Sequence, residues 1–205
     1  MPGRVFLTSP MAELADALGC PVDPVADDPP RQNIAPGQEI VTFTSDGLTR
    51  MRWGMIPVGR VNARGRPVME TIINARSETM FDKSAYAGTG RAVVPVNGWY
   101  EWTGERRKKT AWRITPKQGG FLYFAAITDL WTGPGGVKVH QVATVTCEPS
   151  ADVRDIHHRM AVILAPADIA LWLGGSEDDV AKLMVPWPDG SLKVEEAEGV
   201  DWDAP

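Results

Sequence analysis

The sequence predicts an α+β protein of one domain, in which a β-rich, barrel-like antiparallel core carries short flanking helices. Three observations support this fold class. Short apolar or alternating runs follow one another through the middle of the chain, each bounded by turn residues. Helical patterns occur only towards the two ends of the chain. The 205 residues contain no internal repeat and no linker between two cores, so residues 1–205 are expected to fold as one unit.

The expected strands are short and regularly spaced. They are EIVTFTS (39–45), LTRMRWGMIP (48–57), RAVVPVNGWYEW (91–102), TAWRITP (110–116), GFLYFAAITDLW (120–131) and VKVHQVATVTC (137–147). Strands spaced in this way are typical of a curved antiparallel sheet or a partly open barrel. Residues 20–38, which precede them, are rich in Pro and are expected to form a loop.

A first short helix is expected in residues 9–19. Ser9 is a candidate N-cap and Pro10 suits the first turn, while Leu14 and Leu18 lie four positions apart on one helical face.

Helices return after the last strand. Residues 150–156 suggest a turn, residues 165–175 an amphipathic helix, and residues 176–184 a helix that begins at Ser176 with acidic first-turn residues. The acidic residues 190–205 are expected to form a solvated tail.

Charge is distributed unevenly along the chain. The net charge of −5 argues by itself against a nucleic-acid binder. Residues 31–117, however, contain 15 Lys/Arg and 7 Asp/Glu, whereas residues 118–205 contain 5 and 14. Because screening limits the reach of distant charges to about 10 Å, a local basic surface can bind phosphates on an acidic protein. Arginines scattered evenly over the surface would give the same counts.

Several classes of protein are excluded or disfavoured. The longest apolar runs are far shorter than the roughly 20 residues of a membrane span, and no secretory leader is expected. Cys20 and Cys147 show no metal-binding spacing, which disfavours a disulfide scaffold or zinc site and suits a reducing cytoplasm. Nucleotide-binding P-loop, dinucleotide, zinc-protease and nucleophile-elbow motifs are absent from the sequence. No cofactor or metal is therefore expected.

Two polar clusters within apolar surroundings are candidates for chemistry. Asn74 and Arg76 in TIINARSET (71–79) alternate at a predicted strand end and so share a face, where they can form a hydrogen-bonding and phosphate-binding pair. They can equally be a turn amide and a surface ion pair. Glu101 in VNGWYEW (96–102) lies among aromatic residues, where burial would raise its pKa and suit it to proton transfer. Strand alternation alone favours a solvent-facing Glu101.

A third cluster precedes a buried-looking strand in DIHHRMAVIL (155–164). One imidazole here can transfer protons near neutral pH, and Arg159 can bind an anion. Adjacent residues on a strand point apart, so one of His157 and His158 is expected to face the site. The eight tryptophans also suit stacking on unpaired bases beside arginines, although most of them are expected in the core.

Taken together, these segments resemble the SOS-response-associated peptidase (SRAP) family over about residues 1–172. The segments that carry the resemblance are NIAPGQ, MRWGMIP, INARSETM, AVVPVNGWYEW, FAAITDLW and IHHRMAVIL, in this order. The resemblance implies a single α+β domain around a β-rich, barrel-like core. It also implies a basic cleft for single-stranded DNA and a role in DNA repair, in which abasic sites are shielded by a covalent protein–DNA linkage.

The resemblance implies a role for each matching residue. In the family, the residue after Met1 is a Cys that captures the ring-opened abasic sugar as a thiazolidine. Here Asn74 would orient the N-terminal residue, Glu101 would assist ring opening, and His157 would act as general acid or base. The positions expected to contact DNA are Gly3, Arg4, Trp53, Arg76, Trp102, Thr146 and Arg159. The peptidase (hydrolase) name reflects self-removal of N-terminal residues by the same nucleophile.

The chain departs from the family at the nucleophile, because position 2 is Pro2. Without an N-terminal Cys, neither thiazolidine formation nor thiol-dependent self-cleavage is possible. If Met1 is removed, the secondary amine of Pro2 can form an iminium with the sugar aldehyde, giving a reversible cross-link and lyase-type strand cleavage. Alternatively, the chain binds single-stranded DNA without covalent capture. A peptidase unrelated to DNA is a third hypothesis, for which no intact nucleophile is present.

The expected partner is single-stranded DNA that contains abasic sites. We also expect a monomer that is cytoplasmic, associates with the nucleoid when bound to DNA, and has no contact with membranes.

Overall fold

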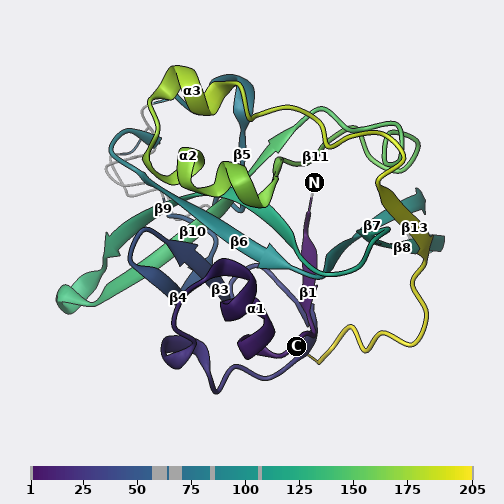
Figure 1. The fold of residues 1–205 in the computed structure, drawn as a ribbon, viewed down its shortest axis with the longest axis horizontal. Coiled ribbons are helices and arrows are strands. Elements are labelled where there is room, and N and C mark those ends of the chain that lie inside the picture. The colour runs from purple at the N-terminus through teal and green to yellow at the C-terminus, as the bar shows by residue number, and fades with distance from the viewer. Residues whose placement is uncertain (1, 57–63, 65–70, 84–85, 106–107, 205) are drawn as a thin grey trace.

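Two β-sheets pack on one hydrophobic core in the computed structural model, which describes residues 2–56, 64, 71–83, 86–105 and 108–204 (Figure 1). The strands are β1 (Arg4–Leu7), β2 (Arg31–Ile34), β3 (Glu39–Thr44), β4 (Gly47–Trp53), β5 (Asn74–Arg76), β6 (Gly90–Val96), β7 (Gly98–Glu105), β8 (Lys108–Pro116), β9 (Leu122–Thr132), β10 (Lys138–Cys147), β11 (Met160–Ala161), β12 (Ile163–Leu164) and β13 (Leu192–Glu196). The α-helices are α1 (Met11–Leu18), α2 (Ile169–Gly174) and α3 (Glu177–Ala181). Short 3-10 helices include η1 (Asp23–Val25), η2 (Ser77–Thr79), η4 (Pro134–Gly136) and η5 (Pro166–Asp168).

The larger sheet contains a closed five-stranded barrel. Around the ring, β10 pairs with β4, β4 with β3, β3 with β6, β6 with β9, and β9 again with β10. The predicted barrel-like core is therefore confirmed, but the barrel is closed rather than partly open. The pairing of β10 with β4 in the ring is parallel, as is its pairing with β5 beside the ring, so the core is not entirely antiparallel. Closure leaves no unpaired edge within the ring.

The smaller sheet has the order β13–β8–β7–β1–β2 and is antiparallel throughout. The run 91–102, which was expected to be one strand, divides at Asn97 into β6 of the barrel and β7 of this sheet. The Asn97 side-chain oxygen accepts hydrogen bonds from the backbone N–H groups of Thr8, at 2.7 Å, and Ser9, at 2.9 Å. This amide therefore fixes the end of β1 to the point where the chain passes from barrel to sheet.

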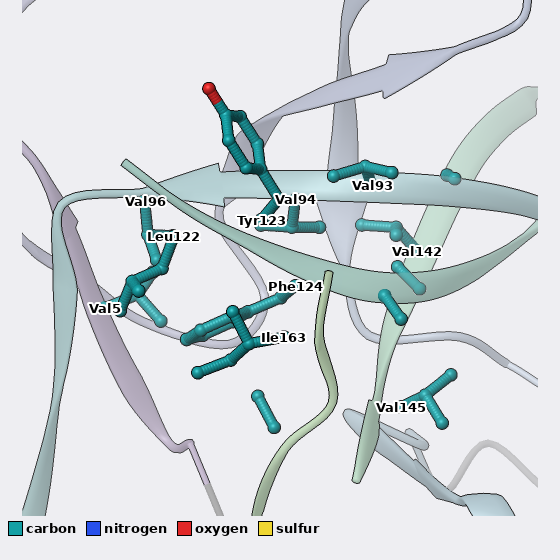
Figure 2. Close-up of a cluster of buried hydrophobic side chains, with 14 of the residues drawn as sticks. Val5, Val93, Val94, Val96, Leu122, Tyr123, Phe124, Val142, Val145 and Ile163 are labelled. Carbon is teal, nitrogen blue, oxygen red and sulfur yellow. The ribbon is translucent and has the colours of Figure 1, made fainter. Parts of the chain in front are cut away.

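The core joins the two sheets. Figure 2 shows Val5 of β1 beside Val96 and Leu122 of the barrel, with Phe124 and Ile163 close by. Every one of these side chains is at least 95% buried. Because β1 and the β11–β12 segment pack on the same barrel strands, the core holds the beginning of the chain close to residues 157–164.

Of the two serines predicted to begin helices, one caps its helix and the other does not. Ser176 caps α3 as predicted, since its hydroxyl accepts a hydrogen bond from the backbone N–H of Asp179. Ser9 does not cap α1. The N-cap is Pro10, and the Ser9 hydroxyl instead accepts a hydrogen bond from the Asn97 amide. A tertiary partner has thus replaced the expected local one.

The prediction of a solvated tail at 190–205 was wrong. Residues Leu192–Glu196 form β13 and pair with β8, and residues 201–204 return to the β1–β2 edge of the same sheet. The expected loop 20–38 likewise contains β2, which pairs with β1. Both strands lie at the edges of the smaller sheet, where pairing with a neighbour compensates for weak apolar patterning.

Among the described residues, no helix has the length and apolar character needed to cross a membrane.

The close packing of β1 on β7 predicts a strong effect of Gly98→Ala. A Cβ at position 98 would lie 2.3 Å from the Ile114 carbonyl oxygen and 2.5 Å from the Phe6 ring. We expect a loss of about 1–3 kcal/mol in the free energy of unfolding, measured by urea denaturation. Gly174→Ala is the matched control, because its Cβ would meet no atom within 4 Å. Equal stability of the two variants would contradict this packing.

Candidate active site

The pairing of β1 with β7 places the first residues of the chain beside Glu101. Arg4 lies opposite Tyr100 and Val5 opposite Trp99. Continuing the same antiparallel register by one residue places Gly3 opposite Glu101. Pro2 is buried and Gly3 is partly buried, so these N-terminal residues lie inside the fold.

Asn74 holds the backbone of Pro2. Its side-chain amide nitrogen donates a hydrogen bond of 3.1 Å to the Pro2 carbonyl oxygen. The amide oxygen accepts a hydrogen bond from the hydroxyl of Thr144, which lies directly opposite Asn74 in the parallel β5–β10 pair. Because the oxygen is occupied by a donor, the amide nitrogen must face Pro2. Thr144 therefore sets the orientation of Asn74, and Asn74 sets the position of the N-terminal backbone.

Glu101 is buried, contrary to the solvent-facing position that strand alternation favoured. Only 3% of its surface is exposed. Glu101 lies on the same face of β7 as Trp99, whose ring packs edge-on against Phe124 of the core. Burial disfavours the charged form and raises the pKa of Glu101 to about 7. Near neutral pH this carboxyl group is present in both forms and can give or accept a proton.

The two histidines stack instead of pointing apart. Their ring centroids lie 4.4 Å apart with an interplanar angle of 22°. The expectation that they diverge was wrong because residues 157 and 158 lie in an irregular segment before β11, not on a strand. His157 is half-buried and His158 is exposed, so His157 remains the better candidate for a role inside the site.

The backbone of Arg159 fixes the His157 ring. Nδ1 lies 2.9 Å from the Arg159 backbone N–H, which donates to the neutral ring, and 3.0 Å from the Arg159 carbonyl oxygen. Burial lowers the pKa of His157 to about 4. The imidazole is therefore neutral at pH 7. When Nδ1 accepts the N–H, the proton of the ring lies on Nε2.

The buried side chain of Arg159 connects segments that lie far apart in the sequence. Its guanidinium forms a bidentate ion pair with Glu78 and donates to the Thr146 carbonyl oxygen at 2.5 Å. Only 8% of Arg159 is exposed. The arginine holds the pKa of Glu78 down at about 2. This ion pair therefore connects β10, η2 and residues 157–159. The guanidinium of Arg159 is buried and is not exposed as a ligand for phosphate.

The remaining residues predicted to contact DNA are found in different environments. Arg76 is exposed on β5, whereas Thr146 is buried and donates its hydroxyl proton to the Ala75 carbonyl oxygen at 3.1 Å. Trp53 is completely buried and donates its indole N–H to the Ile73 carbonyl oxygen at 3.2 Å. Trp53 therefore supports the wall of the site and presents no face for stacking.

Arg4 and Trp102 lie outside this cluster. Trp102 follows Glu101 directly on β7 and so points to the opposite face of the smaller sheet, where it contacts Trp202. Arg4 donates to the Asn33 side-chain oxygen at 2.7 Å. The structure thus brings Pro2, Gly3, Asn74 and Glu101 together, connects them through β10 to His157 and Arg159, and separates them from Arg4 and Trp102.

Sequence reasoning missed Thr144, Glu78, Asn33 and Trp202. One signal was present for Thr144, because two threonines alternate with apolar residues in VATVTC (142–147) and so share a face. The other three depend on partners far away in the chain. In the described part of the chain, no group of three or more His, Cys, Asp or Glu side chains is arranged to hold a metal ion.

A family model described as SOS response associated peptidase (SRAP) matches residues 1–199. The chain belongs to this family. The match covers nearly all of the chain and confirms the resemblance drawn from the six motifs.

Relatives of this SRAP chain occur in bacteria and animals. The abasic site processing protein YoaM of Bacillus subtilis is 31% identical over 208 residues, which cover 95% of this chain and 89% of YoaM. The abasic site processing protein HMCES of Gallus gallus is 31% identical over 154 residues, which cover 63% of this chain and 46% of HMCES.

A solved structure shares the SRAP fold described above. It is a protein from Bacteroides thetaiotaomicron, which superimposes with a TM-score of 0.83 and covers 96% of this chain and 92% of its own, at 21% identity. At this identity the likeness shows a common fold.

The raised pKa of Glu101 predicts how stability depends on pH. A carboxyl group whose pKa rises from 4.5 to about 7 on folding holds its proton more tightly in the folded state. Its contribution to stability is therefore complete below pH 4.5 and is lost as the pH rises to about 7. Relative to Glu101→Gln, the wild type should lose about 3 kcal/mol across this interval, measured by urea denaturation at several pH values. Parallel pH profiles for the two proteins would contradict this.

Proposed function

We propose that this SRAP chain processes abasic sites by binding single-stranded DNA and capturing the ring-opened sugar through its N-terminal residue. The observation that carries the proposal is the position of Pro2. It is buried, its carbonyl oxygen accepts a hydrogen bond from Asn74, and the register of β1 places the next residue, Gly3, opposite Glu101. The names of YoaM and HMCES as abasic site processing proteins support the same substrate.

The proposed chemistry needs removal of Met1, which gives Pro2 a secondary amine with a free lone pair. The amine attacks C1′ of the aldehyde and forms a carbinolamine. Protonation of its hydroxyl group releases water and leaves an iminium. This cation withdraws electrons from C2′, so loss of a C2′ proton can expel the 3′ phosphate and cleave the strand. Water can also hydrolyse the iminium, which makes the capture reversible.

Glu101 suits the proton transfers in this sequence, and His157 suits hydrogen bonding to the reacting sugar. With a pKa of about 7, Glu101 can protonate the carbinolamine hydroxyl and can accept a proton during sugar ring opening. His157 is neutral at pH 7, and because Nδ1 accepts the Arg159 backbone N–H, its Nε2–H can donate a hydrogen bond to an oxygen of the reacting sugar. Asn74 keeps the N-terminal backbone in place during both steps.

DNA would approach from the surface that carries Arg76. This arginine is exposed on β5, two residues from Asn74, and so can neutralise a phosphate near the reacting sugar. Trp102 and Arg4 would contact the strand where it leaves the site.

A second candidate function is non-covalent binding of single-stranded DNA. It is favoured by Pro2, because this residue lacks the thiol of the family's Cys. While Met1 remains attached, the Pro2 nitrogen is also an amide with no nucleophilic lone pair. The surface that would bind DNA is the same in both cases.

Borohydride trapping distinguishes the two functions. The protein, with its N-terminus first established by intact mass, is incubated with a single-stranded oligonucleotide that contains one abasic site. We expect an adduct that survives denaturing electrophoresis only when borohydride is present, with the added mass on Pro2. A tetrahydrofuran analogue, which has no aldehyde, is the control and should give no adduct.

Pro2→Cys provides the matched positive control, because it restores the 1,2-aminothiol and should form an adduct without borohydride. If the wild type lacks Met1, binds the abasic strand and yet yields no trapped adduct, non-covalent binding is the correct function. If neither abasic nor intact single-stranded DNA binds, both candidates are wrong.

The hydrogen bond from Thr144 to Asn74 predicts a kinetic effect in the Pro2→Cys background. Thr144→Val removes the hydroxyl with little change in shape, and the Asn74 amide then loses its fixed orientation. We expect adduct formation to slow by about tenfold, equivalent to one hydrogen bond of about 1.4 kcal/mol. Thr144→Ser should restore the rate. A Thr144→Val rate equal to its parent, measured in single turnover with melting temperatures recorded in parallel, would contradict the assigned role.

A further inference from the structure

The C-terminal segment 201–204 covers part of the outer face of the smaller sheet. After β13 the chain leaves the sheet and returns to the β1–β2 edge, as the yellow end of the ribbon shows in Figure 1. The side chain of Asn33, which is 2% exposed, donates to the carbonyl oxygens of Asp201 at 3.1 Å and Ala204 at 2.8 Å. The segment is thus bound at two backbone positions by one buried amide.

Between these two anchors, Trp202 rests on an aromatic surface. Its ring centroid lies 5.0 Å from that of Tyr100, in an edge-on contact with an interplanar angle of 80°, and 5.3 Å from that of Trp102, tilted by 59°. Tyr100 in turn packs on Phe6, with centroids 5.1 Å apart. Trp102 is half-buried, and the contact with Trp202 covers a ring that would otherwise have more surface in solvent.

Residues 201–204 also contact the side chain of Arg4. One guanidinium nitrogen donates to the Asn33 side-chain oxygen at 2.7 Å and lies 3.4 Å from the Trp202 carbonyl oxygen. The carboxylates of Asp201 and Asp203, on either side of Trp202, belong to exposed residues. The segment therefore places an aromatic ring and an acceptor oxygen against the sheet and carries negative charge on its exposed side. A single-stranded nucleotide likewise combines an aromatic base with acceptor oxygens and negative charge.

We propose that Trp202 and its acidic neighbours occupy a base-binding position on the surface formed by Arg4, Tyr100 and Trp102, and that single-stranded DNA must displace them to bind there. This inference rests on the proposed function, whose partner it shares. Displacement requires no change in the sheet, because β13 ends at Glu196 and the segment forms no strand. The contacts to be exchanged are ring contacts and hydrogen bonds, which an unpaired base and its phosphate can replace.

The inference predicts that weakening the segment strengthens DNA binding. The full-length Trp202→Ala variant is compared with wild type for binding a fluorescein-labelled, unmodified single-stranded oligonucleotide, followed by fluorescence anisotropy. Loss of two aromatic contacts should lower the Kd by about three- to tenfold. Trp202→Phe, which keeps an aromatic ring, should give an intermediate value.

Trp131→Ala is the matched control, since it removes a partly buried indole from β9, a strand of the larger sheet, and should leave the Kd unchanged. Trp102→Ala should weaken binding whether or not Trp202 is present. If wild type and Trp202→Ala bind DNA with equal Kd, or if Trp202→Ala binds more weakly, competition is wrong while the proposed function stands. If neither protein binds single-stranded DNA, the proposed function fails and this inference fails with it.

Discussion

The pairing of β1 with β7 is the interaction on which the rest of the site depends. It passes through Gly98, where a side chain would collide with Ile114 and Phe6, and it ends at Asn97, whose amide binds the backbone after β1. Register along a strand advances in single residues, and each step reverses the face of every side chain. A slip of one residue would expose Val5 and remove Pro2 from Asn74. The buried side chains of Val5, Phe6 and Leu7 therefore position the N-terminus as well as stabilising the sheet.

Much of the fold could be predicted from the sequence, because the long strands carry their own periodicity. Residues 39–45, 110–116 and 137–147 alternate or run apolar, and each forms a strand close to the expected bounds. Closure of the barrel could not be predicted, since it depends on β9 and β10 pairing with each other and with different strands on their other sides. The edge strands β2 and β13 were missed for a related reason, because RQNI and LKVEE become strands only beside β1 and β8.

The candidate site was predictable in its residue types but not in its environments. Motif resemblance selected Asn74, Glu101 and His157, yet the burial of Glu101 follows from the packing of β7 on the core, which alternation within VNGWYEW does not contain. Arg159 looks like an anion ligand in the sequence, and its partner Glu78 lies 81 positions earlier in the chain. The short distances that matter here join residues far apart in sequence, and a single sequence carries no signal for such pairs.

The ion pair between Glu78 and Arg159 has a further consequence for how the protein responds to acidity. Glu78 keeps its charge down to a pH of about 2, below the values of about 4 and about 7 at which His157 and Glu101 exchange protons. The Glu78–Arg159 ion pair, which holds residues 157–159 against β10, therefore keeps its charges throughout the pH range in which His157 and Glu101 titrate. Within the site, the effect of pH on stability in this range comes from Glu101 and His157 themselves and not from the ion pair.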